Sequence, residues 1–341
     1  MLERFSIKLQ RYRIPLLIAV FAVACLIPFC VQSAYVLRIC VVALMNIILA
    51  LSLNMMIGLL GQMSFGHAAF FGIGAYTAAL LSTKLKLPAE LTFPAAMAMA
   101  GLFGILLGLP VLKLKGYYFV IVTMVFCEIM RIIELNWMDL TRGPLGIMAI
   151  PKPSFFGFKI SSQREFYFLA LILVIITLVV ICNIMNSRIG YAIMAIRDDE
   201  LAASSMGVDI FKYKILVFVI SSCFAGLAGA LYAQYTGYID PTSFTNNKSN
   251  ELLVMVIFGG LGNLLGSFIG AITLSVVPEL LRGLATYRQL IYGIVLVLLM
   301  MVRPDGLLGS INFKYLGQRD RCLQGQDKNR EKRRTFPWKK C

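Results

Sequence analysis

Residues 39–60, ICVVALMNIILALSLNMMIGLL, decide the fold, because these 22 residues include no Asp, Glu, Lys or Arg. A helix needs about 20 predominantly apolar residues to cross the core of a bilayer, so the stretch predicts a membrane span. Of the 341 residues in the chain, 59% are apolar and 14% are charged, whereas soluble domains carry about 25% charged residues. The apolar residues suffice for about ten spans. The sequence therefore predicts an all-α, polytopic membrane protein and excludes an ordinary soluble enzyme.

Apolar runs separated by charged or turn-forming residues predict ten spans. The run 14–31 follows basic residues and resembles a signal peptide, but its length favours a first span. The run 251–261 is too short to cross alone, so a re-entrant segment is the alternative there. An even number of spans places both termini on one side of the membrane. The predicted spans are residues 14–31, 39–60, 63–83, 91–112, 116–137, 166–185, 215–235, 251–261, 264–281 and 288–302.

Positive charge is concentrated at the two ends of the chain. Residues 1–13 hold four basic residues and one acidic residue, and residues 310–341 hold ten basic and three acidic residues. These ends supply +10 of the formal net charge of +15. Because Lys and Arg accumulate on the cytoplasmic side, both ends are predicted to be cytoplasmic and to flank a membrane domain over 14–309. The basic tail is predicted to be disordered and drawn to anionic lipid.

Two connecting loops are long enough to contact partners. The outer loop 138–165 contains Gly143-Pro144 and Pro151-Lys152-Pro153, and we expect an ordered docking surface there. The inner loop 186–214 is the longest polar stretch between inner ends of spans. Within it, Ile196–Gly207 predicts one short helix, because acidic residues cluster at its start and a glycine suits its end. Such a helix is either a solvated connector or a lever that docks into a cytoplasmic partner.

Two glycine-rich joints resemble each other in sequence. They are Gly58-Leu-Leu-Gly61-Gln-Met-Ser-Phe-Gly66 and Gly259-Gly-Leu-Gly262-Asn-Leu-Leu-Gly266, and each joins two apolar runs. Matching joints in two halves mark the substrate route in many internally repeated transporters. Close helix packing through small residues explains them equally well. The candidate pathway residues are Gly61, Gln62, Ser64, Phe65, Gly66, His67, Gly259, Gly260, Gly262 and Asn263.

The sequence offers no catalytic or cofactor motif. It lacks G-x-x-x-x-G-K-[ST], so any ATP use must come from another subunit. The only histidine, His67, has no H-E-x-x-H around it, and the eight cysteines form no metal-binding spacing. We favour the interpretation that His67 forms a hydrogen bond between helices; the alternative is that it is a polar group of the transport pathway. We therefore predict a chain that is not an enzyme and binds no cofactor.

Three charged residues fall inside the predicted span 116–137. Glu128, Arg131 and Glu134 lie at i, i+3 and i+6, so the arginine can pair with either acid on the helix surface. An unpaired charge at mid-membrane costs about 2.5–3.5 kcal/mol on insertion scales, so pairing within the protein is expected. A proton relay, typical of a secondary transporter, is the alternative.

Four segments resemble, in the same order, the signature of the branched-chain amino acid ABC importer permeases of the M type. The first is Gly61-Gln-Met-Ser-Phe-Gly-His-Ala-Ala-Phe-Phe-Gly-Ile-Gly-Ala-Tyr76, and the others are residues 187–203, 258–266 and 303–309. The resemblance implies a bacterial inner-membrane importer of leucine, isoleucine and valine. It also implies a second, H-type permease, two cytoplasmic ATPases that bind ATP and Mg, and a periplasmic binding protein. Urea, short amides and other amino acids are alternative substrates, and a proton-coupled secondary transporter is the alternative mechanism.

The resemblance further implies a motif, E-A-A-x-x-x-G, that sits in a groove of the ATPase. Its positions match Glu200, Ala202, Ala203 and Gly207, with Leu201 as an additional residue. Small side chains would let the helix approach the groove closely, while the charges of Arg197, Asp198, Asp199 and Glu200 would set its register. A secondary transporter needs no such docking helix, so this segment separates the two mechanisms.

Overall fold

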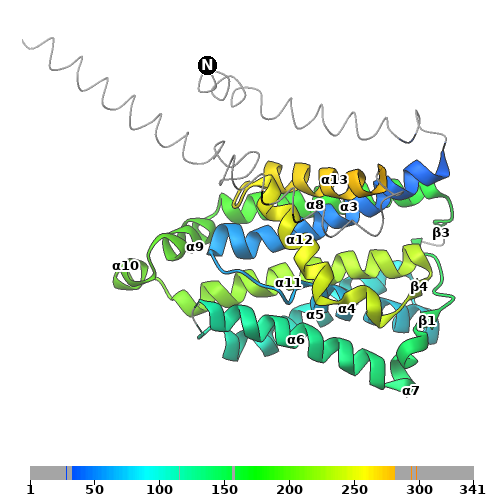
Figure 1. The fold of residues 1–341 in the computed structure, drawn as a ribbon, viewed down its shortest axis with the longest axis horizontal. Coiled ribbons are helices and arrows are strands. Elements are labelled where there is room, and N and C mark those ends of the chain that lie inside the picture. Colours follow the sequence, from blue (N-terminus) through cyan, green and yellow to red (C-terminus); the bar gives the residue numbers. More distant parts are fainter. Residues whose placement is uncertain are drawn as a thin grey trace, which may run out of the picture.

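The computed structural model describes residues 33–280, apart from residues 115, 156 and 157, and the isolated residues 28, 293 and 297. The described chain is mostly helical (Figure 1). The arm 1–13, the predicted spans 14–31 and 288–302 and the segment 303–341 lie outside the continuous described range. The elements are α3 (Ala34–Asn54), η1 (Met55–Leu59), α4 (His67–Lys84), α5 (Ala89–Val111), α6 (Tyr117–Asn136), α7 (Met138–Thr141), η2 (Gly143–Leu145), β1 (Ile147–Met148), β2 (Ser154–Phe155), β3 (Phe158–Lys159), α8 (Gln163–Met185), α9 (Arg188–Asp198), α10 (Glu200–Ser205), α11 (Ile210–Thr236), β4 (Tyr238–Ile239), η3 (Pro241–Phe244), α12 (Asn246–Gly259) and α13 (Leu264–Leu280).

Every predicted span between residues 39 and 281 coincides with a helix. The ends differ from the prediction by up to five residues, for example in α12, which begins at 246 rather than at 251. Four helical segments of the described chain are long and apolar enough to cross a membrane: α3 with η1, α5, α8 and α11. The prediction of a helical membrane protein is therefore confirmed.

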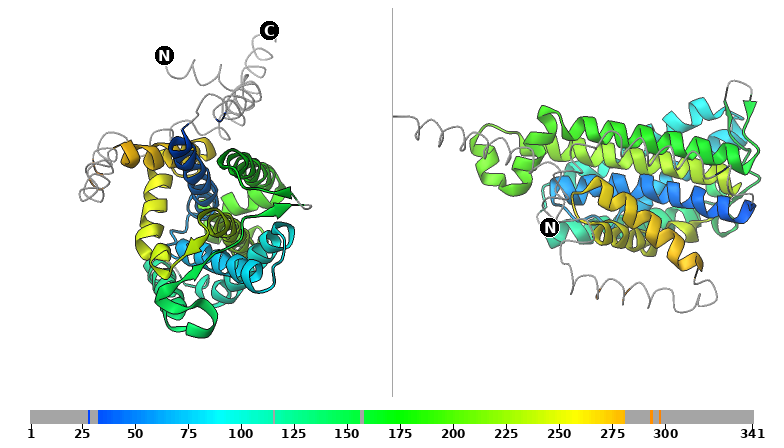
Figure 2. Two further views of the ribbon diagram at one scale, coloured as in Figure 1. Left: turned by 90° about the vertical axis from the view of Figure 1, so that its right-hand side faces the viewer. Right: turned by 90° about the horizontal axis from the view of Figure 1, so that it is seen from above.

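Helix α11 occupies the centre of the bundle and packs closely against α4 (Figure 2). Glycines on both helices permit this approach. A methyl group on Gly74 would collide with the carbonyl of Gly226, and one on Gly229 would collide with the carbonyl of Phe71. Small residues of this kind let membrane helices approach backbone to backbone.

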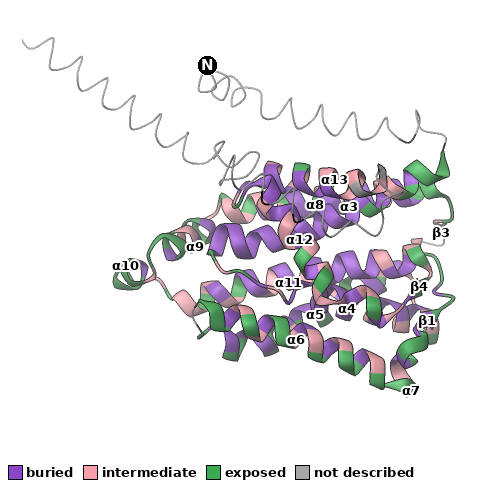
Figure 3. Ribbon diagram, in the orientation of Figure 1, coloured by how far each residue is buried: buried purple, intermediate pink, exposed green. Residues whose placement is uncertain are grey.

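The outer faces of the bundle remain apolar. Buried residues fill α3 and α11, whereas exposed residues appear along α6 and at the two ends (Figure 3). Contiguous exposed apolar surface indicates contact with lipid or with another protein. Exposed apolar side chains on α5, α6 and α8 include Leu102, Leu106, Ile121, Ile129, Ile172 and Val179.

The loops gather at opposite ends of the bundle (Figure 1). One end carries α9 and α10. The other carries α7 and two small antiparallel sheets, in which β1 pairs with β4 (Ile147 opposite Ile239) and β2 pairs with β3 (Ser154 opposite Lys159). The predicted outer loop 138–165 therefore has regular structure and lies at the end opposite the predicted inner loop.

A break separates α12 from α13, so residues 251–281 do not form one long helix. The 14 residues of α12 span about 21 Å at 1.5 Å per residue, less than the hydrocarbon core of about 30 Å. The chain enters α12 from within the bundle, because the Phe244 ring packs 5.2 Å from that of Phe71 and 5.8 Å from that of Tyr76. α12 is thus too short to cross alone, as predicted.

Candidate coupling site and translocation pathway

The predicted coupling segment forms two helices. α9 ends immediately before Asp199 and α10 begins immediately after it, with Asp199 in an extended conformation (φ −156°, ψ 112°). Its carboxylate accepts hydrogen bonds from the backbone N–H groups of Leu201 (2.8 Å) and Ala202 (3.1 Å). This is the geometry of an N-cap. The prediction of one helix over Ile196–Gly207 is therefore wrong, because an N-cap residue leaves the helical conformation and starts a new helix.

Gly207 ends α10, as predicted. Its φ is +81°, a left-handed conformation that favours glycine. Its N–H donates to the carbonyl of Ser204 (2.9 Å), and the N–H of Val208 donates to the carbonyl of Ala203 (3.1 Å). These two bonds form a Schellman motif, which satisfies the last carbonyl groups of the helix. The α9–α10 loop (residues 186–209) thus has a well-defined end.

The tip of the α9–α10 loop exposes large apolar side chains. Leu201 is 79% exposed and Met206 is 84% exposed. Ala203 is buried, whereas Ala202 is exposed, so only one alanine of the predicted pair is available to a partner. Exposed apolar residues on a projecting loop are typical of a docking surface.

Most of the charges in this loop are engaged within the chain. The Lys214 ammonium is 2.6 Å from the Glu200 carboxylate, and the Lys214 side chain is only 4% exposed. The Arg197 guanidinium donates through Nη1 to the carbonyl of Gly58 (2.5 Å). Asp199 caps α10, and Asp198 is exposed. Of the four charges expected to set register against a partner, Arg197 and Glu200 therefore hold the loop to its own bundle.

The two glycine-rich joints are in direct contact. A methyl group on Gly58 would lie 2.5 Å from the Cα of Gly262, and the N–H of Gly262 donates to the Asn54 side-chain oxygen (3.0 Å). The Nη1 of Arg197 lies 3.3 Å from the position that a Gly262 Cβ would occupy. Arg197 therefore binds the first joint and lies beside the second. This geometry agrees with one of the two interpretations of the glycine-rich joints, namely that their small residues allow close packing.

The first joint also explains where α4 begins. Gly61 has a φ of +75°, which ends η1, and residues up to 66 are not helical. The N–H of Phe65 donates to the hydroxyl of Thr123 (3.2 Å), and a methyl group on Gly66 would lie 2.9 Å from the carbonyl of Thr123. Gln62 is partly exposed and Ser64 is buried. The predicted span 63–83 therefore starts four residues too early.

His67 is buried and bridges two helices. Its Nε2 lies 2.7 Å from the Ser52 hydroxyl, which itself lies 2.8 Å from the carbonyl of Leu49. A serine hydroxyl has one proton, so when Ser52 donates to Leu49, Nε2 of His67 is the donor to Ser52. The geometry matches the interpretation that His67 forms a hydrogen bond between two helices.

The second joint has a capping residue of its own. The Asn263 side-chain oxygen accepts hydrogen bonds from the N–H groups of Leu265 (3.1 Å) and Gly266 (3.4 Å), at the start of α13. Gly260 has a φ of 114° and follows the end of α12, and a methyl group on Gly259 would collide with the carbonyl of Gly266. These residues form the turn between α12 and α13.

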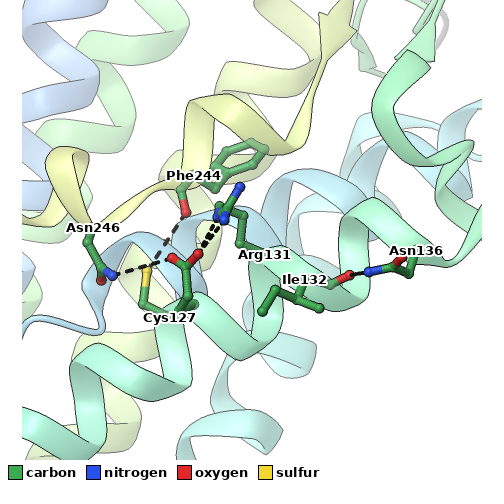
Figure 4. A network of polar contacts seen from close by, with 7 residues as sticks. Cys127, Arg131, Ile132, Asn136, Phe244 and Asn246 are labelled. Carbon is green, nitrogen blue, oxygen red and sulfur yellow. Dashed lines mark hydrogen bonds and ion pairs between the residues drawn. The ribbon is translucent and has the colours of Figure 1, made fainter.

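Arg131 pairs with only one of the two acidic residues near it on α6. Arg131 forms an ion pair with Glu128, whose other oxygen lies 3.5 Å from the Asn246 amide (Figure 4). Glu134 is buried, and its Oε2 has no hydrogen-bond partner among the described residues. Of the two acids predicted as possible partners, Arg131 therefore pairs with Glu128 and not with Glu134.

Sequence reasoning missed several polar residues inside the apolar runs. Asn46, Ser52 and Asn54 in α3 are all buried and contact residues of distant helices or joints. Polar side chains in a membrane span are costly and usually functional or paired. Their presence in an otherwise apolar run was the available signal.

The bundle and its apolar outer faces define a helical membrane protein. The family described as branched-chain amino acid transport system / permease component matches residues 35–302, and this chain belongs to it.

Named relatives agree with this assignment. Over 315 residues the chain is 39% identical to the high-affinity branched-chain amino acid transport system permease protein LivM of Escherichia coli (strain K12), covering 86% of this chain and 74% of that protein. The LivM protein of Salmonella typhimurium is 38% identical with the same coverage. The LivH permease of E. coli is 25% identical over 287 residues, covering 77% of this chain and 90% of that protein. No solved structure matches the chain.

Proposed function

We propose that this chain is the M-type permease subunit of an ATP-driven importer that carries leucine, isoleucine and valine across the bacterial inner membrane. The names of the relatives at 38–39% identity support the substrate class. The observation that carries the mechanism is the exposed apolar tip of the α9–α10 loop, because an ATP-driven permease needs a docking element for its ATPase and an ion-coupled carrier does not.

The proposed assembly contains a second, H-type permease, two ATPases and a periplasmic binding protein. The weaker similarity to LivH supports a pair of related permeases. The ATPases would hold ATP and Mg, so this chain carries no nucleotide. The proposed topology has ten crossings, the eighth made by α12 together with the segment that leads into it, and it places the α9–α10 loop and both termini in the cytoplasm.

The contacts of Arg197 provide a route from the ATPase to the membrane domain. Closure of the ATPase pair would move α10, and α9 would move with it. Because Arg197 binds the carbonyl of Gly58 and approaches Gly262, this movement would reach the ends of α3 and α12. Tilting of these helices as rigid bodies would then alternate access to the pathway.

Uptake of labelled leucine into proteoliposomes tests this function. The vesicles would contain this chain, the H-type permease, both ATPases and the binding protein. We expect uptake that needs ATP. Uptake driven by a proton gradient without the ATPases would contradict the proposal, and ATP-driven uptake of urea or an amide, but not leucine, would contradict the substrate class.

We expect Leu201→Glu to abolish binding of the ATPases while the chain stays folded. Leu201 is 79% exposed, and surface substitutions usually change stability by no more than about 0.5 kcal/mol. A new charge in an apolar interface is costly unless it is paired. Co-purification of the ATPases and the thermal midpoint of the permease pair are the measurements.

Leu145→Glu is the matched control, because Leu145 is 70% exposed and lies in η2 between α7 and β1, two elements at the end of the bundle opposite α10 (Figure 1). Loss of ATPase binding in both variants, or in neither, would contradict the docking role of the α9–α10 tip.

A further inference from the structure

Two ion pairs lie away from the ends of the bundle and outside the coupling segment. One joins Glu128 and Arg131 on α6, and the other joins Lys248 and Glu251 on α12. Asn246 is the first residue of α12, two positions before Lys248, and its amide contacts Glu128. Both ion pairs therefore lie next to the start of α12.

The Lys248 pair is held in place by α3 and α13. Its Nζ lies 3.1 Å from the Asn46 side-chain oxygen and 3.4 Å from the Glu251 carboxylate. The Asn46 amide nitrogen donates in turn to the hydroxyl of Ser275 (2.9 Å). Among the described residues, Asn46 and Glu251 thus both contact the Lys248 ammonium.

The Lys248 pair lies at membrane depth and is partly open. Asn46 lies twelve residues after Ala34, the start of α3, or about 18 Å along the helix. The Lys248 and Glu251 side chains are 21% and 27% exposed. Charged residues at this depth face the interior of an assembly or a water-filled path rather than lipid. The open side of the pair therefore faces a path or a partner helix.

We propose that Lys248 and Glu251 form a contact site for the zwitterionic head of an amino acid during its passage. The inference rests on the proposed function, which supplies the substrate class. The substrate carboxylate would replace Glu251 beside the Lys248 ammonium, and the substrate ammonium would bind Glu251. Each charge exchanges one opposite partner for another, so no charge at this depth is left unpaired.

Asn46 orients Lys248 and suits this exchange. Its side-chain oxygen keeps one contact on the ammonium while the carboxylate partner changes. The apolar side chain of the substrate takes no part in this contact, so the site selects amino acids as a class and does not discriminate among leucine, isoleucine and valine.

The test compares leucine uptake and ATP hydrolysis in proteoliposomes that contain the whole importer. We expect Lys248→Gln to reduce uptake at least tenfold while hydrolysis stimulated by the binding protein continues, and Lys248→Arg to restore most of the uptake. Lys212→Gln, on an 82% exposed lysine at the start of α11, is the control and should transport normally. Uptake by Lys248→Gln at the wild-type rate would overturn the inference.

A charge swap separates substrate contact from a structural ion pair. The double variant Lys248→Glu with Glu251→Lys keeps an i, i+3 pair, and the Asn46 amide can flip to donate to the new carboxylate. If the ion pair is only structural, the swap should restore uptake, and that result would overturn the proposal. Loss of assembly in Lys248→Gln would also overturn it, because it would show that the pair contacts a partner helix. A substrate contact predicts continued hydrolysis and impaired uptake. Absence of ATP-driven uptake in the wild type would instead contradict the proposed function.

Discussion

Replacing Arg197 by methionine is expected to reduce ATP-driven leucine uptake at least tenfold while ATP hydrolysis continues. Methionine keeps much of the length of the side chain but cannot donate to the carbonyl of Gly58, which Arg197 contacts at 2.5 Å. The α9–α10 loop would then move without the joints. Coupling free energies between sites are typically 1–3 kcal/mol, or about 5- to 150-fold. The measurement is the number of leucine molecules transported per ATP hydrolysed.

Arg188→Met is the matched control for this uncoupling. Arg188 is an exposed arginine at the start of the same helix, α9, and its loss should leave the ratio of transport to hydrolysis unchanged. A normal ratio in Arg197→Met would contradict the proposed route. Equal loss of uptake and hydrolysis would show instead that Arg197 supports assembly.

Gly58→Ala is expected to lower the stability of the permease and to block uptake. The added methyl group would lie 2.5 Å from the Cα of Gly262 and would also collide with the side-chain oxygen of Asn54. Backbone atoms cannot move aside as a flexible side chain can, so the two joints must separate. Overpacking typically costs about 1–3 kcal/mol. The thermal midpoint of the purified permease pair and the leucine uptake of the importer are the measurements.

Gly108→Ala provides the comparison for the extra methyl group. A methyl group there would meet a ring carbon of Phe218 at 3.2 Å and no backbone atom at such a distance, so the overlap is much smaller than at Gly58, and alanine is favoured over glycine in a helix interior by about 1 kcal/mol. We expect nearly normal stability and uptake. If Gly58→Ala behaved like Gly108→Ala, the contact between the joints would not control transport.

Local sequence predicted the helices well but not their ends. Apolar runs such as 39–60 locate each span, because burial in lipid or protein requires about 20 apolar residues whatever their neighbours are. The start of α4 depends on Gly61 and on contacts of the preceding segment with Thr123. These contacts join residues about 60 positions apart, and no local pattern encodes them.

The candidate site was predicted only in part. Glycine predicted the end of the coupling segment at 207, since a left-handed φ favours that residue type. Asp199 was counted among charges that face a partner, yet it caps α10. Whether an acidic residue continues a helix or caps the next one depends on φ and ψ, which composition does not reveal.

By itself, the sequence determined that this chain is a helical membrane protein with a projecting polar loop and two glycine-rich joints. Hydrophobicity and residue size are properties of each residue, so they can be read without a structure. Only the tertiary structure decided that the two joints touch, that Arg197 binds the first of them, and that Lys248 meets Asn46 from 202 positions away. Such pairings depend on how the helices cross, and the crossings are set by the packing of the whole bundle.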